Sequence, residues 1–188
     1  IADYWIWKFS NKTSGDYSQW QHLRSTGTIL VGEGFTMKGP GTDSIPALQD
    51  YVFEGKPNNG DINITVSTGN NYLIGNPYPS AIDANQFILD NEAVIGGTGS
   101  TTGTLYFWQH WGGGSHILKE YQGGYATYTI AGSAPAPFIG VPPPGLLNEP
   151  GRYIPVAQGF FVVAETNGTI IFNNGQRVFQ TEGTNSVF

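Results

Sequence analysis

The residues best suited to binding a ligand are aromatic side chains in the second half of the chain. Trp108, His110 and Trp111 lie close together, and Tyr121 and Tyr125 flank a later glycine pair. Exposed aromatic rings can stack on the apolar faces of sugar rings, and binding residues are often found on loops. Because three glycines follow Trp111, we expect a loop from that residue onward. We predict that these five residues form a carbohydrate-binding surface.

The tryptophans also have a purely structural interpretation. Trp5, Trp7 and Trp108 lie in segments of strand-like composition, where large rings are often part of the core. Trp111 could likewise fold back and cover an edge of the fold instead of facing a ligand. Exposure of Trp111, Tyr121 and Tyr125 on one platform would favour binding, and burial of these three would favour the structural interpretation.

Metal and thiol chemistry is poorly supported by the residue types. The chain has no cysteine, which excludes disulfides, thiolate zinc sites and a cysteine nucleophile. His110 and His116 lie six residues apart without a converging set of further ligands, so we assign no transition metal. Asp43, or Asp61 behind two asparagines, could contribute to a structural calcium site. No complete ligand set is visible, and no cofactor is assigned.

Catalysis is also not indicated. Glycoside hydrolysis needs two facing carboxylates, and the 14 acidic residues show no spacing that singles out a pair. Ser80 is explained by helix capping and not by nucleophilic chemistry. We therefore predict a non-catalytic protein, with a polysaccharide-active enzyme fragment as the third-ranked alternative.

Charge and hydropathy exclude several classes of partner. The formal net charge is −6, and the eight Lys and Arg residues are scattered, so we expect neither nucleic-acid binding nor attraction to an anionic membrane. No apolar run is long enough for a membrane span, and no signal peptide is visible. Since the chain begins at Ile1, we expect a mature product or an excised domain.

The elements that must position these residues are predicted to be short strands. Only 12% of the residues are charged, and Gly, Asn and Thr are abundant, which favours strands joined by tight turns. We predict a flexible linker over 96–104, a long extended loop over 131–151, and a hairpin formed around the 56–61 turn. The strand near 169–172 is expected to pair with 156–164. Other strands are predicted near 4–9, 62–66, 72–74, 105–108, 125–130 and 178–179.

One helix is predicted near residues 81–90. Ser80 and Asp83 have the spacing of a capping box, and Ile82, Phe87 and Ile88 form an apolar stripe.

A weak internal repeat suggests two related halves. Residues 30–37 (LVGEGFTM) resemble residues 155–162 (PVAQGFFV), each preceded by an aromatic strand and followed by a phenylalanine strand with an Asn-Gly turn. The repeat would relate residues 1–68 to 100–188, joined by the strand–helix unit 72–92. Half a sandwich could not cover its apolar face, so we predict one module over residues 1–188.

Three motifs carry a family resemblance. They are LIGNPYPSAID at 73–83, IPVAQGFFV at 154–162 and IFNNGQR at 171–177. Together with residues 32–38 and 55–60, they resemble a module of large secreted and surface proteins of Bacteroidetes, especially flavobacteria. That module usually precedes a type IX secretion sorting domain, which does not itself occur in this sequence. The resemblance implies export to the cell surface and carries no catalytic residues.

These observations predict an all-β fold, a sandwich or jelly-roll-like module. The expected function is that of a secreted or cell-surface, non-catalytic part of a larger protein, with carbohydrate binding or adhesion preferred. The expected partners are a polysaccharide or surface glycan and neighbouring domains. The alternative is a purely structural spacer or assembly domain that supports export or surface display.

Overall fold

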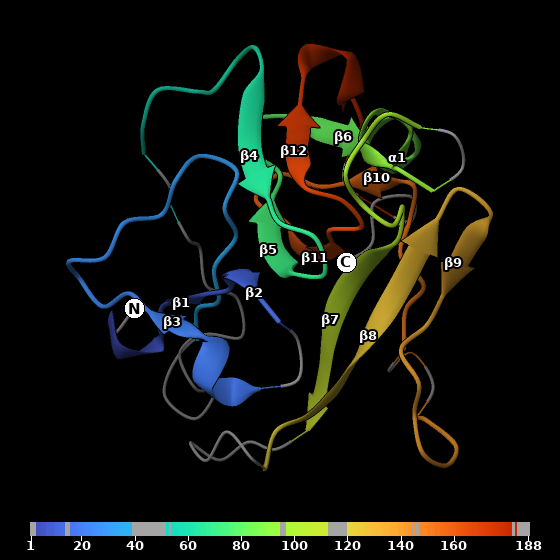
Figure 1. Cartoon of the computed structure of the whole chain (residues 1–188). Coiled ribbons are helices and arrows are strands. Elements are labelled where there is room, and N and C mark those ends of the chain that lie inside the picture. Colours follow the sequence, from blue (N-terminus) through green and yellow to red (C-terminus); the bar gives the residue numbers. More distant parts are fainter. Residues whose placement is uncertain are drawn as a thin grey trace.

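The computed structural model of the protein describes residues 3–13, 16–38, 52, 54–94, 97–112, 120–143, 145, 147–181 and 183. Within these ranges the chain forms thirteen β-strands and one α-helix, together with short 3-10 turns. Strands are the main regular elements in Figure 1, and the single helix lies near the top of the view. The predicted all-β class with one short helix is confirmed.

The larger layer is a six-stranded sheet in which all neighbouring strands are antiparallel. Strands β7 and β8 form a long hairpin that extends away from the rest of the sheet (Figure 1). In spatial order the strands are β2 (Ser10–Lys12), β5 (Asn71–Gly75), β11 (Gly159–Val163), β7 (Leu105–Gly112), β8 (Gln122–Thr129) and β9 (Gly132–Ala134).

Smaller elements form the second layer. The strand pair β4 (Ile62–Val66) and β12 (Gly168–Phe172) lies beside helix α1 (Ala84–Asn91) and a three-stranded sheet. That sheet has the order β10 (Tyr153–Ile154), β6 (Ala81–Asp83) and β13 (Arg177–Val178). The N-terminal part contributes β1 (Trp7–Lys8) paired with β3 (Gln21–His22), and 3-10 turns lie at Asp3–Trp5, Tyr17–Gln19 and Asn174–Gln176.

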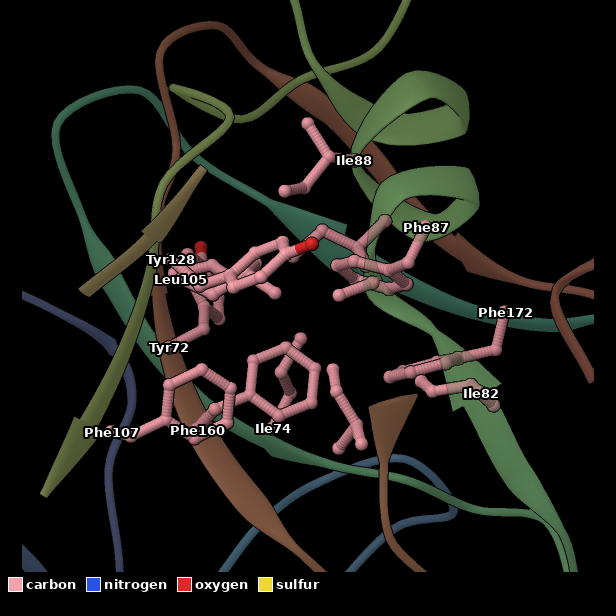
Figure 2. Packing of buried hydrophobic residues seen from close by; sticks show 14 of the residues in the cluster. Tyr72, Ile74, Ile82, Phe87, Ile88, Leu105, Phe107, Tyr128, Phe160 and Phe172 are labelled. Carbon is pink, nitrogen blue, oxygen red and sulfur yellow. The ribbon is translucent and has the colours of Figure 1, made fainter. Parts of the chain in front are cut away.

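One continuous core lies between the two layers (Figure 2). Because side chains alternate along a strand, Phe160 and Val162 of β11 face this core while Phe161 faces the opposite side. Phe160 meets Phe87 of α1 edge to face, with ring centroids 5.5 Å apart. Full burial of one phenylalanine side chain contributes about 1.5–3 kcal/mol, so these rings are main sources of cohesion between the layers.

The helix begins later than predicted. Residues 81–83 form strand β6, and Asp83, not Ser80, is the N-cap: its carboxylate accepts a hydrogen bond of 3.0 Å from the backbone N–H of Asn85. The apolar stripe is confirmed, since Ile82, Phe87 and Ile88 are all buried. Three strand residues therefore precede the helix and fix its first turn against the core.

One predicted pairing is wrong because the strand pairs with a partner distant in sequence. Strand β12 pairs with β4 and not with β11, although a tight turn connects it to β11. Among the described residues β4 pairs with β12 alone, and the hairpin around the 56–61 turn stays a prediction. Positions 51 and 53 of the predicted first strand of that hairpin lie outside the described residues.

Three segments differ from the expected local structure. The predicted strand 4–9 is replaced by a 3-10 turn at Asp3–Trp5 and the two-residue strand β1. The predicted linker 96–104 contains Ser100 and Thr101, which are buried and hydrogen-bonded to Asn91, so its described part is a fixed connection. The predicted loop 131–151 contains the short strand β9.

The two segments that match in sequence have the same turn. In residues 30–33 and 155–158 the fourth residue donates its backbone N–H to the first, over 3.0 and 3.3 Å. The third residue has a positive φ in both, 87° at Gly32 and 61° at Ala157. The first turn is bridged to Ile74 on one side of β5, and β11, which follows the second turn, pairs with Ile74 on the other side. The two matched segments therefore share a turn and both lie next to β5, and the relation between residues 1–68 and 100–188 stays a prediction.

Asn76, at the end of β5, connects the two layers through a buried amide. Its Nδ2 group donates to the carbonyls of Ser80, Ile154 and Pro155 over 2.9, 3.3 and 3.0 Å. Its Oδ1 accepts from the backbone N–H of Tyr78 over 3.0 Å. All of these backbone groups would lose a partner without this side chain, and unsatisfied buried groups cost about 1–3 kcal/mol each.

The role of Asn76 predicts a large effect of a nearly isosteric substitution. Asn76→Asp is expected to lower the free energy of unfolding by at least about 3 kcal/mol at neutral pH, because a carboxylate cannot donate to three carbonyls and would repel them. Urea denaturation followed by tryptophan fluorescence measures the loss. Asn63→Asp, at an exposed position of β4, is the matched control and should change stability little. A loss below about 1 kcal/mol at Asn76 would contradict this role.

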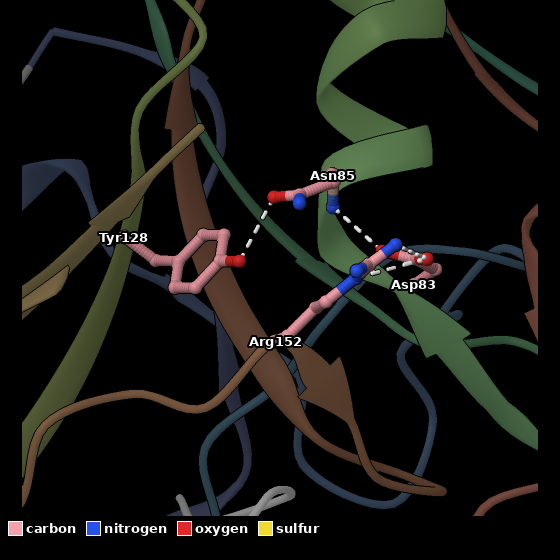
Figure 3. A network of polar contacts seen from close by, with 4 residues as sticks. All are labelled: Asp83, Asn85, Tyr128 and Arg152. Atoms are coloured by element: carbon pink, nitrogen blue, oxygen red, sulfur yellow. Dashed lines mark hydrogen bonds and ion pairs between the residues drawn. The ribbon is translucent and has the colours of Figure 1, made fainter. Parts of the chain in front are cut away.

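Asp83 also anchors an ion pair (Figure 3). Arg152 approaches its carboxylate with Nη2 at 2.7 Å and Nε at 3.0 Å, and Tyr128 donates its hydroxyl to the Asn85 side chain over 2.8 Å. Burial alone would raise the pKa of Asp83, but the hydrogen bonds from Arg152 and from the Asn85 backbone outweigh it and lower that pKa. The carboxylate of Asp83 therefore remains charged in the folded protein at pH values just below its ordinary pKa.

Because the pKa of Asp83 is lowered, part of the free energy of unfolding depends on pH in the acid range. The contribution of Asp83 should be complete above its ordinary pKa of about 4 and should be lost as pH falls through the lower pKa of the folded state. Urea denaturation of the wild type and Asp83→Asn across the acid range measures it. The difference between the two proteins should shrink as the pH falls, and a difference that does not depend on pH would contradict the assignment.

Candidate functional site

Trp108 and Tyr125 lie together on the face of the six-stranded sheet that points away from the core, here called the outer face. They are directly opposed on β7 and β8, with ring centroids 5.1 Å apart in an edge-to-face arrangement. Trp108 is 46% and Tyr125 37% exposed. The indole of Trp108 lies against Gly123, where a β-carbon would collide with it. Because Gly123 has no side chain, the indole of Trp108 can lie flat against β8.

A groove of about 580 Å³ lies beside this pair on the outer face. Phe161 is one of its lining residues and meets Tyr125, Phe9 and Trp20 edge to face, with ring centroids 5.6, 5.5 and 5.9 Å apart. Aromatic rings from β7, β8, β11 and the N-terminal segment therefore form one continuous surface. The groove is lined by Phe9, Asp16, Tyr17, Trp20, Gly69, Asn71, Tyr106, Tyr125, Phe161 and Val163.

The groove has apolar walls and a polar end. Tyr17 is 65% exposed and belongs to the 3-10 turn that Asp16 caps. The backbone N–H of Ser18 donates to Asp16 over 2.8 Å and lowers the pKa of this carboxyl, so it is ionised at neutral pH. Burial raises the pKa of Tyr125, which keeps its hydroxyl neutral. The groove thus combines exposed rings with Asp16, Asn71 and tyrosine hydroxyls as hydrogen-bonding groups.

Trp111 lies elsewhere. Contrary to the expected loop, it is part of β7, and the alternation of the strand directs it to the face opposite Trp108. It is half-buried over Gly124 and Ala136 and meets Phe138 edge to face at 5.3 Å. Trp111 has therefore folded back onto the sheet, and the three-residue platform with Tyr121 and Tyr125 is not formed.

His110 and Tyr121 form a separate pair, with ring centroids 5.3 Å apart. Lys38 donates to the Tyr121 hydroxyl over 2.7 Å, and its ammonium lies 4.7 Å from the ring centroid of Trp5. Such cation–π contacts hold the N-terminal segment to the end of the β7–β8 hairpin. His116 and the rest of 113–119 lie outside the described residues.

The sequence prediction therefore found two residues of this aromatic face, Trp108 and Tyr125, and missed most of the groove. Strand alternation in β7 and β11 was the available signal for Tyr106 and Phe161, because Phe107 and Phe160 are core residues. No comparable signal linked the N-terminal rings Phe9, Tyr17 and Trp20 to this face.

Two further findings concern the described parts of the chain only. No group of three or more His, Asp or Glu residues there could hold a metal ion. No described helix is long and apolar enough to cross a membrane. Asp43, one of the residues considered for calcium, lies outside these ranges.

Comparison with known proteins gives a family. Neither the curated proteins nor the solved structures contain a match to the chain. A family model described as a domain of unknown function, DUF8693, matches residues 2–188 and so includes the groove and all five predicted binding residues. This match covers nearly the whole sequence, and the chain therefore belongs to the DUF8693 family.

Proposed function

We propose that the chain is a non-catalytic glycan-binding module of a larger secreted or cell-surface protein, and that the outer-face groove holds the glycan. The observation that carries the proposal is the continuous set of rings around Phe161, which includes the exposed Tyr17 and Tyr125. Sugar rings present apolar faces to such rings and hydroxyls to their polar neighbours. The surface location rests on the resemblance of the sequence motifs to exported Bacteroidetes modules.

The composition of the groove favours binding over hydrolysis. Asp16 is the one carboxylate among its described lining residues, whereas most glycosidases use two carboxylates on opposite sides of the bond. No Lys, Arg or His is found among the same residues. A negative charge without a cation among the described lining residues disfavours polyanionic chains, so a neutral polysaccharide is the expected ligand.

Affinity electrophoresis on a panel of neutral polysaccharides, followed by calorimetry on those that retard the protein, tests this proposal. Tyr17→Ala and Tyr125→Ala should each weaken binding at least about fivefold, because each removes a ring from the groove. Trp111→Ala should retain binding, because Trp111 is on the other face.

Tyr4→Ala is the matched control for Tyr17→Ala, since both tyrosines are exposed and belong to N-terminal 3-10 turns. Tyr4 does not line the groove. Far-ultraviolet circular dichroism would verify that each variant is folded. No retardation on any polysaccharide would reject glycan binding and leave the spacer or assembly role. Binding that survives both groove substitutions would exclude this groove as the site.

A further inference from the structure

Three sequence motifs that take no part in the groove meet around Arg177 in the second layer. The guanidinium donates from Nε to Ser80 Oγ over 3.1 Å, and from Nη1 to Asn59 Oδ1 and Asn174 Oδ1 over 3.0 and 3.2 Å. Its central carbon lies 5.2 Å from the ring centroid of Tyr78. Arg177 is thus fixed in place by three neutral acceptors and one aromatic ring.

The hydrogen-bond geometry leaves several donors without a protein partner. Asn174 Oδ1 also accepts from the backbone N–H of Gly60 over 3.2 Å, which fixes the orientation of this amide. Since Asn59, Ser80 and Asn174 each use their oxygen to accept from Arg177, their own N–H and O–H groups are left over. In the described part of the chain, neither these groups nor Nη2 of Arg177 has a hydrogen-bond partner.

The side chains that carry these donors, except Asn59, line a hollow of about 470 Å³. Ser80, Asn174 and Arg177 line its polar side, and Val178 and the fully exposed Phe179 line its apolar side. Openings lined by donors and one positive charge are suited to an anion, and the apolar side is suited to the organic body that carries it.

The charge of Arg177 is not neutralised within the described residues. Lys8 and Arg152 form ion pairs with Glu33 and Asp83, whereas no carboxylate lies within 4.0 Å of Arg177. Burial and the nearby Asp61 raise the pKa of Tyr78 and Arg177 opposes them, so Asp61 acts on the phenol without pairing with the guanidinium. A bound carboxylate would supply the missing negative charge.

We propose that this hollow is a second binding site, separate from the groove, for a small organic carboxylate such as a uronic acid. Nη2 of Arg177, the amide of Asn174 and the hydroxyl of Ser80 donate to the carboxylate. Val178 and Phe179 contact the body that carries it. The site does not depend on glycan binding in the groove, because its residues come from other strands and turns.

Titration of the isotope-labelled protein with glucuronate, observed by ¹H–¹⁵N NMR, tests the site. Glucuronate should produce saturable shifts at residues 174–179 with a dissociation constant of about 1–10 mM, and glucose at the same concentrations should produce none. Acetate separates the carboxylate from the sugar: saturable binding of both confirms the carboxylate site, and tighter binding of glucuronate adds a role for the apolar wall.

Two variants and one control make the test specific. Arg177→Gln should abolish the shifts. Asn174→Asp keeps the acceptor for Arg177 but places a negative charge among the donors, so it should weaken binding at least about tenfold even if Arg177→Gln fails to fold. Arg152→Gln removes an arginine that is already paired with Asp83 and should leave glucuronate binding unchanged. Equal binding of glucose, or no saturable response to glucuronate, would overturn the proposal.

Discussion

The buried amide of Asn76 is the interaction on which the two-layer arrangement depends. It terminates β5 in the larger sheet, and it also donates to the carbonyls of residues 80, 154 and 155, which belong to the second layer and its connection to β11. A hydrophobic core alone is non-directional and would allow the layers to slide. Directional bonds to a buried amide define one relative position, and so they also fix where β6 and helix α1 begin.

The residues of β7 and β11 that face the core determine which of their neighbours lie on the outer face. Every core residue of β7 and β11 has a neighbour that must point outward, and several of those neighbours are aromatic: Tyr106 and Trp108 beside Phe107, and Phe161 beside Phe160. The N-terminal segment then packs Phe9 and Trp20 against Phe161 and closes one side of the groove. The groove is therefore formed by a set of aromatic side chains that neither layer buries completely.

The sequence was most informative where structure is local. The all-β class, the helix with its stripe of Ile82, Phe87 and Ile88, and the end of β5 at Gly75 followed from composition, periodicity and turn residues. Pairing was not predictable in the same way, because β12 joins β4 across most of the chain, and such contacts leave no local pattern. Trp111 was assigned to a loop because glycine was taken as a loop signal. Glycines also occur inside the strands of this protein: Gly123 and Gly124 lie within β8, next to Trp108 and Trp111 respectively.

The Asn-Gly turns around Arg177 have a consequence for the chemical durability of the protein. In an Asn-Gly sequence the backbone nitrogen of the glycine can attack the asparagine side chain and expel ammonia, and water then opens the resulting cyclic imide to a carboxylate. Here the nitrogen of Gly60 donates to Asn174 and the nitrogen of Gly175 donates to Asn173, over 3.2 and 2.8 Å. Each nitrogen is thereby held by a neighbouring side chain, away from the geometry of attack. These two contacts thus slow the conversion of Asn59 and Asn174 to aspartates, whose negative charge would neutralise Arg177.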